Sequence, residues 1–130
     1  EDSSRPALVF MHHPPFITGM GAMDEPFEGA DLLRDVLSRA PWARLCCGHM
    51  HRPIFTAWAQ GLALTVPSIS MQIDLDLSPQ GGDTFRMEMP GYMLHHWDGS
   101  HLNSHVCQIP ADVDFSGPHP FADSVNPVED

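Results

Sequence analysis

The sequence contains no lysine, and its six basic residues stand against 17 acidic ones, which gives a formal net charge of -11. Without a basic patch to neutralise phosphates, a nucleic-acid-binding surface is excluded. A small anionic ligand would need positive charge from another source, and bound metal ions can supply it.

Long apolar runs are also missing. The longest apolar runs reach only about five or six residues, far short of the roughly 20 that cross a membrane. The first residues also lack the basic-then-apolar pattern of a signal peptide. The three cysteines, Cys46, Cys47 and Cys107, are odd in number, and the adjacent pair lies in an apolar run. This pattern favours buried thiols of a reducing compartment over a disulfide framework, so we expect a cytoplasmic protein without membrane contact.

The chain is long enough for one domain with a core, because 42% of its 130 residues are hydrophobic. We assign residues 1–110 to that domain and residues 111–130, rich in proline and acid, to a tail that wraps the surface or frays. Most of the 13 prolines and 10 glycines lie between periodic segments and therefore mark loops.

A short strand is predicted for residues 7–11, which are apolar at every position, as in a parallel sheet that is covered on both faces. His12 and His13 follow it directly. Pro14 and Pro15 end the strand there because proline cannot donate to a ladder. The loop over residues 16–27 is long enough to suggest a functional role.

A helix follows, then a second strand. Leu33, Val36, Leu37 and Ala40 form an apolar stripe at helical spacing, and residues 43–47 are a second short strand, apolar except for Arg44. Strand, helix and strand in this order form a parallel unit with a right-handed crossover, so both strands end at one edge of the sheet. That edge is where open α/β sheets bind ligands.

Mostly antiparallel strands are predicted downstream. Two of them, residues 53–58 and 62–66, flank a turn at Gln60–Gly61, and another covers residues 71–77. Residues 78–90 are interpreted as a mobile excursion. A final hairpin pairs residues 91–97 with 102–109 around Asp98–Gly99, and we expect it to close an edge of a sheet.

The second strand is followed by Gly48, His49, Met50 and His51. In an extended backbone the two imidazoles would project to the same face, which suits a metal ion. Such a pair can equally be solvated or packed in a core. Its convergence with His12 at one sheet edge favours the metal site.

Other histidines and the methionines carry weaker signals. His95, His96, His101 and His105 could form a second metal cluster, but strand alternation separates the adjacent pair, so solvent-facing side chains are favoured. The methionines could line a substrate or subunit surface, whereas core filling is their default role.

The residues Leu8 to Pro15, followed about 35 positions later by Cys47 to His51, resemble the last two motif blocks of the calcineurin-like binuclear metallophosphoesterases. Within that family they are most similar to the bacterial class III cyclic-nucleotide phosphodiesterases and glycerophosphodiesterases. The resemblance extends from about Arg5 to the hairpin at Asp98–Gly99. It implies an α/β fold, the C-terminal half of a four-layer α/β sandwich.

The resemblance also implies two divalent or mixed-valence metal ions (Mn, Fe, Zn or Co). His12 and His49 would bind one ion, and His51 would bind the other. His13 has no ligand counterpart in the family; it would bind substrate, orient the turn, or simply be packed or solvated. Two such ions can bridge a hydroxide and clamp a small phosphodiester, of the glycerol or 3',5'-cAMP type.

The family's first three blocks, Asp-x-His, Gly-Asp and Gly-Asn-His, do not precede the two histidine blocks here, and the one Gly-Asp pair, Gly82–Asp83, comes after them. We therefore expect the C-terminal part of a longer enzyme, inactive by itself, with no catalytic residue assigned. Half of a sheet would leave open strand edges, which favour a homo-oligomer. Two alternatives remain, a non-enzymatic module that binds one zinc and an oligomerisation segment.

Overall fold

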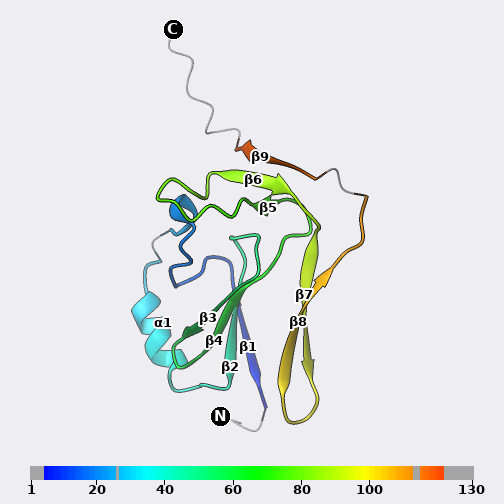
Figure 1. Cartoon of the computed structure of the whole chain (residues 1–130). Coiled ribbons are helices and arrows are strands. Elements are labelled where there is room, and N and C mark those ends of the chain that lie inside the picture. Colours follow the sequence, from blue (N-terminus) through cyan, green and yellow to red (C-terminus); the bar gives the residue numbers. More distant parts are fainter. Residues whose placement is uncertain (1–4, 26, 113–114, 122–130) are drawn as a thin grey trace.

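The computed structural model describes residues 5–25, 27–112 and 115–121 (Figure 1). No helix within these ranges is long and apolar enough to cross a membrane. The elements in chain order are β1 (Ala7–Met11), the 3-10 helix η1 (Gly21–Met23), α1 (Ala30–Leu37), β2 (Ala43–Cys47), β3 (Ile54–Trp58), β4 (Gly61–Thr65), β5 (Gln72–Ile73), β6 (Thr84–Met87), β7 (Gly91–Trp97), β8 (Leu102–Gln108) and β9 (Ser116–Pro120). The predicted α/β class is confirmed.

The main sheet has the strand order β1-β2-β4-β3. β1 pairs with β2 in parallel, with Val9 opposite Leu45 and Met11 opposite Cys47. β4 is parallel to β2, whereas β3 is antiparallel to β4. Both strands of the predicted parallel unit are confirmed, and their carboxyl ends lie side by side.

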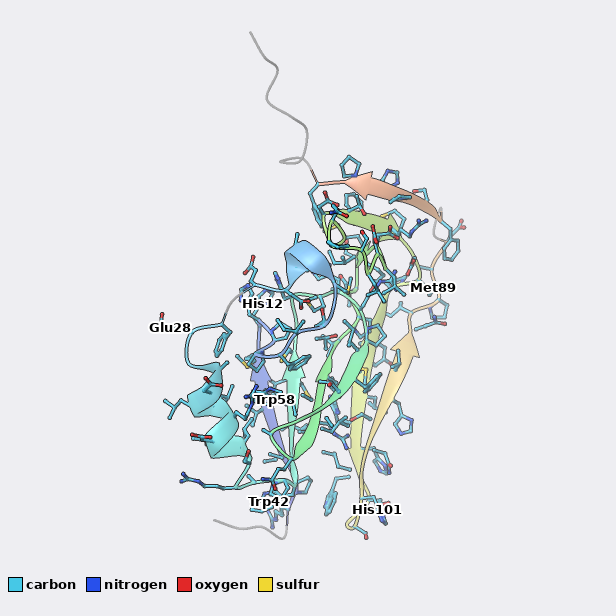
Figure 2. All side chains as sticks on the ribbon, turned by 60° about the vertical axis from the view of Figure 1, so that its left-hand side comes forward. His12, Glu28, Trp42, Trp58, Met89 and His101 are labelled. Carbon is cyan, nitrogen blue, oxygen red and sulfur yellow. The ribbon has the colours of Figure 1, made fainter. Side chains whose placement is uncertain are left out.

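Helix α1 covers one face of this sheet. Leu33 and Leu37 pack on a buried cluster that includes Leu45 and Trp58, and Figure 2 shows Trp58 between the helix and the sheet. The predicted apolar stripe extended to Ala40, but the helix ends at Leu37. Beyond it, the N–H groups of Arg39 and Ala40 donate to carbonyls three residues earlier, in the tighter pattern of a 3-10 turn. The C-terminal end of the helix lies beside the amino-terminal ends of β1 and β2.

The hairpin between β3 and β4 turns one residue earlier than predicted. Ala59 and Gln60 have φ angles of 51° and 62°, and Trp58 pairs with Gly61. Two left-handed residues in a two-residue loop match the twist of the flanking strands. The prediction of Gln60–Gly61 as the turn was therefore wrong by one position.

Residues 71–90 differ most from the sequence-based prediction. Of the strand predicted for residues 71–77, only Gln72 and Ile73 form a strand. The next residues of the predicted alternation, Leu75 and Leu77, are exposed. The predicted excursion contains strand β6, which pairs with β5 and with β9 from the chain's end. Such long-range pairing leaves no local signal in the sequence, so the excursion was predicted wrongly.

The final hairpin, β7–β8, has nearly the predicted bounds, but it forms a separate two-stranded sheet and does not close an edge. It is tied to the main sheet by Arg44 of β2. Nη2 of Arg44 donates to the carbonyl of Leu102 at 2.8 Å, and Nη1 donates to Oγ of Ser104. Nε2 of His95 lies 3.7 Å from Sγ of Cys46.

Stability should fall as the pH drops below about 6.5, partly because of His95. Burial, and then the charge of Arg44, lower the pKa of His95 below its usual 6.5. The unfolded chain therefore binds more protons in the window between the two values, so the free energy of unfolding decreases there on acidification. We expect His95→Gln to flatten this slope in thermal unfolding from pH 7.5 to 5. His96→Gln, on the opposite face of β7, is the control, and an equal slope in both variants would contradict the prediction.

A second core cluster lies above the carboxyl edge. Met20, Met50 and Ile73 are 0–1% exposed and pack with Met23 and Ile54. The core-filling role is thus confirmed for the methionines of this cluster. Cys46 and Cys47 are buried free thiols, also as predicted. Burial, and then the neighbouring Cys46, raise the pKa of Cys47 to about 12, so its thiol stays protonated at neutral pH.

Candidate metal centre

The carboxyl ends of β1 and β2 bring the two histidine motifs together. The N–H of Gly48 donates to the carbonyl of Met11 at 3.2 Å and to that of His12 at 2.9 Å, which locks the two strand ends to each other. Gly48 also allows a close approach. A Cβ at this position would lie 3.1 Å from Nδ1 of His12, so a larger residue would push the imidazole away.

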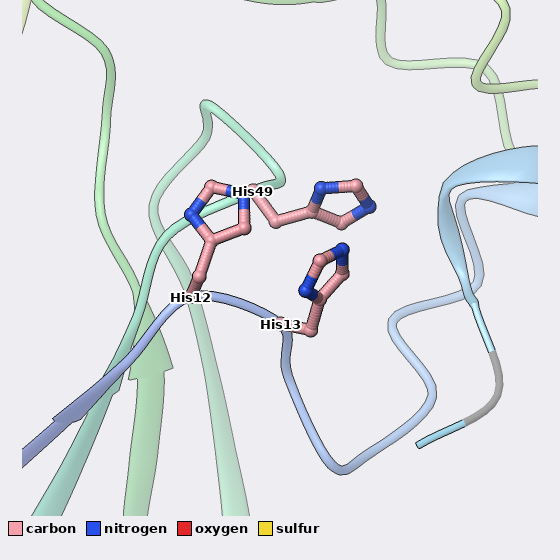
Figure 3. Close-up of side chains that lie close together, drawn as sticks. All are labelled: His12, His13 and His49. Carbon is pink, nitrogen blue, oxygen red and sulfur yellow. The ribbon is translucent and has the colours of Figure 1, made fainter. Parts of the chain in front are cut away.

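Three imidazoles form the centre. One ring nitrogen from each of His12, His13 and His49 falls within a group whose atoms lie within 4.8 Å of one another (Figure 3). The ring centroids are 4.8 Å apart for His12 and His13, 5.4 Å for His12 and His49, and 4.3 Å for His13 and His49. No other such group occurs within the described ranges. His13 is therefore closer to the predicted ligands than the sequence indicated.

The backbone from Gly48 to His51 is not extended. His49 and His51 have φ angles of 66° and 50°, and the Met50 side chain between them is fully buried. Nε2 of His49 lies 3.1 Å from the carbonyl of Met23, whereas Nδ1 of His51 lies 3.2 Å from the carbonyl of Met71. The expectation that strand alternation projects both imidazoles together was wrong. The role of His51 as ligand of another ion stays a prediction.

The loop after the first histidine block completes the surroundings of the centre, and Asp24 organises it. Its Oδ1 accepts hydrogen bonds from the N–H and the hydroxyl of Thr18, each at 2.8 Å. Its Oδ2 accepts from the N–H groups of Gly19 and Met20, at 2.8 and 3.1 Å. These bonds fix a turn that ends in η1, from which the carbonyl of Met23 points to His49.

Glu25, in the same loop, contributes a carboxylate. Its Oε2 lies 2.9 Å from Nε2 of His13, and its charge also acts on His49. The sequence-based reasoning missed both Asp24 and Glu25. The available signal was an acidic pair inside a long glycine-containing loop between the histidine blocks.

The electrostatics of His49 favour a neutral ring. Burial is the main cause of its lowered pKa, and the nearby His13 adds to the effect, whereas Glu25 and the bond to Met23 oppose it. A carbonyl only accepts, so Nε2 of His49 carries the hydrogen in the bond to Met23 and Nδ1 keeps its lone pair. This is the usual arrangement of a metal-binding histidine, whose other nitrogen donates to an oxygen atom.

The three imidazoles fit a metal ion of intermediate hardness. Neutral imidazoles suit ions such as Zn and Fe, and the exposure of His12 leaves the group open on one side. Glu25 and the carbonyl of Met23 supply oxygen atoms that hold two of the rings in orientation. Of the four other histidines considered above, His96, His101 and His105 are exposed, as predicted, whereas His95 is partly covered.

No protein-family model matches the sequence. The chain is 37% identical over 118 residues to a probable glycerophosphodiester phosphodiesterase of Arcobacter nitrofigilis, an alignment that covers 88% of this chain and 42% of that protein. It is 31% identical over 110 residues to a probable cyclic nucleotide phosphodiesterase of Rhodopseudomonas palustris, covering 82% and 40%. It is 31% identical over 100 residues to a glycerophosphodiester phosphodiesterase of Enterobacter lignolyticus, covering 73% and 34%.

These similarities confirm the resemblance based on the two histidine blocks. The chain is homologous to part of the bacterial phosphodiesterases that act on glycerophosphodiesters or cyclic nucleotides, according to the names of those relatives. It spans between about a third and two fifths of the length of the curated relatives it matches.

Proposed function

We propose that the chain contributes the histidine ligands of a metal-dependent phosphodiesterase that acts on a glycerophosphodiester or a 3',5'-cyclic nucleotide. The cluster of His12, His13 and His49 carries this proposal, because its donor atoms lie within 4.8 Å of one another at the carboxyl ends of two parallel strands. The names of the homologues support the reaction class.

His12 and His49 would hold one ion, with His13 beside it, and His51 would contribute to a second. When bound, two such ions would generate a hydroxide nucleophile and neutralise the charge of the phosphodiester. The protein's own residues keep the centre in place. The hydrogen bond from His49 to Met23 fixes the ring's tautomer, and the contact of Glu25 with His13 fixes that ring's orientation.

Carboxylate ligands are scarce around this cluster. The blocks Asp-x-His and Gly-Asn-His do not occur in the sequence, and its one Gly-Asp pair, Gly82–Asp83, follows the histidine blocks instead of preceding them. Of the acidic side chains within the described residues, Glu25 contacts the cluster. We therefore propose that other residues, in a complete four-layer α/β sandwich, supply the remaining ligands. By itself the chain is expected to hydrolyse phosphodiesters at a negligible rate.

A chimera tests the proposal. Residues 5–109 would replace the matching segment of the Arcobacter nitrofigilis relative, and hydrolysis of bis(p-nitrophenyl) phosphate would be measured with Mn²⁺. We expect the chimera to be active and its His12→Ala variant to lose about a thousandfold in kcat/KM. His105→Ala, an exposed histidine on β8, is the matched control. A folded chimera without activity, or one insensitive to His12→Ala, would refute the proposal.

A second candidate role, self-association, is favoured by the open edge of β1. This five-residue edge strand is apolar throughout, and its Phe10 side chain is 68% exposed. Edge strands of this kind pair readily with another chain.

We expect Phe10→Asp to raise the dissociation constant for self-association at least about tenfold, as measured by analytical ultracentrifugation. Phe55→Asp offers a matched control, since Phe55 is 50% exposed on β3 at the other edge of the same sheet. Wild-type chain that stays monomeric at high concentration would rule out this role.

A further inference from the structure

The amino-terminal ends of the strands border a cavity that the proposed phosphodiesterase centre does not use. Its volume is about 620 Å³, and the side chains with polar or aromatic groups along it include Arg5, Trp42, Arg44, Trp97 and His101. Figure 2 shows Trp42 and His101 near the lower end of the molecule, away from His12. The cavity is therefore a separate feature from the histidine cluster.

Arg44 gives this cavity an unusual charge. Its Nη groups donate to neutral partners, the carbonyl of Leu102 and the hydroxyl of Ser104, and its buried Nε has no hydrogen-bond partner within the described residues. Arg52 and Arg86, by contrast, each pair with a carboxylate. A partly buried cation that is held only by neutral groups is stabilised when an anion binds beside it.

The aromatic side chains supply a second recognition element. Trp42 comes from the connection between α1 and β2, and Trp97 ends β7, so the two indoles reach the cavity from different elements. They are 37% and 39% exposed. Indole faces and a guanidinium together favour a planar ring that carries negative charge.

We infer that this cavity binds a small organic anion with a planar ring, whose carboxylate or phosphate lies at Arg44 and whose ring contacts the indoles. Its volume lies in the range of small-molecule sites. Arg5 and His101 add polar groups at the rim. The neighbouring carboxylate of Asp98 accepts the N–H groups of Ser100 and His101 and is engaged in its own turn.

Four probes separate the contributions of charge and ring. Benzoate and phenyl phosphate carry both, cyclohexanecarboxylate carries only the charge, and phenol carries only the ring. Each probe is titrated into the full chain without added metal, and its binding is followed by tryptophan fluorescence. We expect the fluorescence change to saturate with benzoate and with phenyl phosphate. The other two should bind at least about fivefold more weakly. Equal affinity for benzoate and cyclohexanecarboxylate, or no saturation by either aromatic anion up to about 10 mM, would overturn the inference.

A second readout identifies the charged contact. Burial, and then the charge of Arg44, lower the pKa of His95, which lies outside the lining of the cavity. A bound anion offsets that charge, so saturating benzoate should raise the pKa of His95, measured by NMR titration of its ring. A bound probe that leaves this pKa unchanged would show that it does not lie at Arg44.

Trp42→Leu tests the ring contact without touching the bonds that Arg44 makes to the hairpin. We expect the variant to weaken benzoate binding about five- to tenfold. Phe55→Leu, an exposed aromatic on the far strand β3, should leave binding unchanged. Loss of affinity in both variants, or in neither, would contradict the proposed site.

Discussion

Replacing His49 with alanine should abolish the stabilisation of the chain by zinc. At a zinc concentration about a hundredfold above the dissociation constant, binding to the native state adds about 3 kcal/mol and raises the Tm by about 10 °C. His49 is the ring whose lowered pKa and Nε2 hydrogen bond to Met23 best prepare it for coordination. Without it, we expect the affinity to fall at least a hundredfold and the shift in Tm to vanish.

Differential scanning calorimetry with and without zinc measures this effect. His105→Ala is the control, because His105 is exposed on β8 and outside the three-histidine group. A zinc-induced shift that survives in His49→Ala and disappears in His105→Ala would locate the ion elsewhere. The alternative of a purely structural zinc site predicts the same loss of the zinc-induced shift in His49→Ala. It differs in predicting that the chimera has no phosphodiesterase activity.

The second large effect is expected from Asp24→Ala. Four donors lose their acceptor, and three of them are backbone N–H groups of the loop. Hydrogen bonds to a charged group contribute about 1.5–3 kcal/mol each, although such values do not add, so a total loss of about 3 kcal/mol is reasonable. Because the same loop holds the carbonyl of Met23 against His49, zinc affinity should also fall about tenfold.

Urea unfolding and zinc titration measure the two parts of this prediction separately. Asp35→Ala removes an exposed carboxylate on α1 and is expected to change stability by less than about 0.5 kcal/mol. If Asp24→Ala destabilises the chain but leaves the zinc affinity unchanged, the loop supports the fold and not the centre.

The parallel unit was predictable because its signals are local. Residues 7–11 are apolar on both faces, a pattern typical of a strand between two layers, and residues 43–47 are apolar except for Arg44. Pro14 ends the first strand and Gly48 follows the second, so the positions of His12 and His49 at one edge follow from strand order alone. The structure places these two rings 5.4 Å apart, measured between centroids.

The orientation of each histidine was not predictable in the same way. Met50 is drawn into a core cluster with Met20 and Ile73, and this packing accompanies left-handed conformations at both His49 and His51. Side chains from three distant segments form that cluster, so no pattern within Gly48 to His51 encodes it.

Residues 71–121 illustrate the same limit on a larger scale. β6 is stabilised by pairing with β9, about 30 positions later, and by the bond from Nη1 of Arg86 to the carbonyl of Gly117 at 2.9 Å. The glycines and polar residues around it predict a loop when only the local sequence is considered. Long-range pairing overrides that preference.

NMR of the histidine rings during titration with one equivalent of zinc shows directly whether the three-histidine cluster binds a metal ion. We expect the resonances of His12, His13 and His49 to shift or broaden together, whereas those of His96, His101 and His105 should not change. Uniform small shifts across all histidines, or saturation at a different set of rings, would show that the cluster at the carboxyl ends of β1 and β2 is not a metal centre.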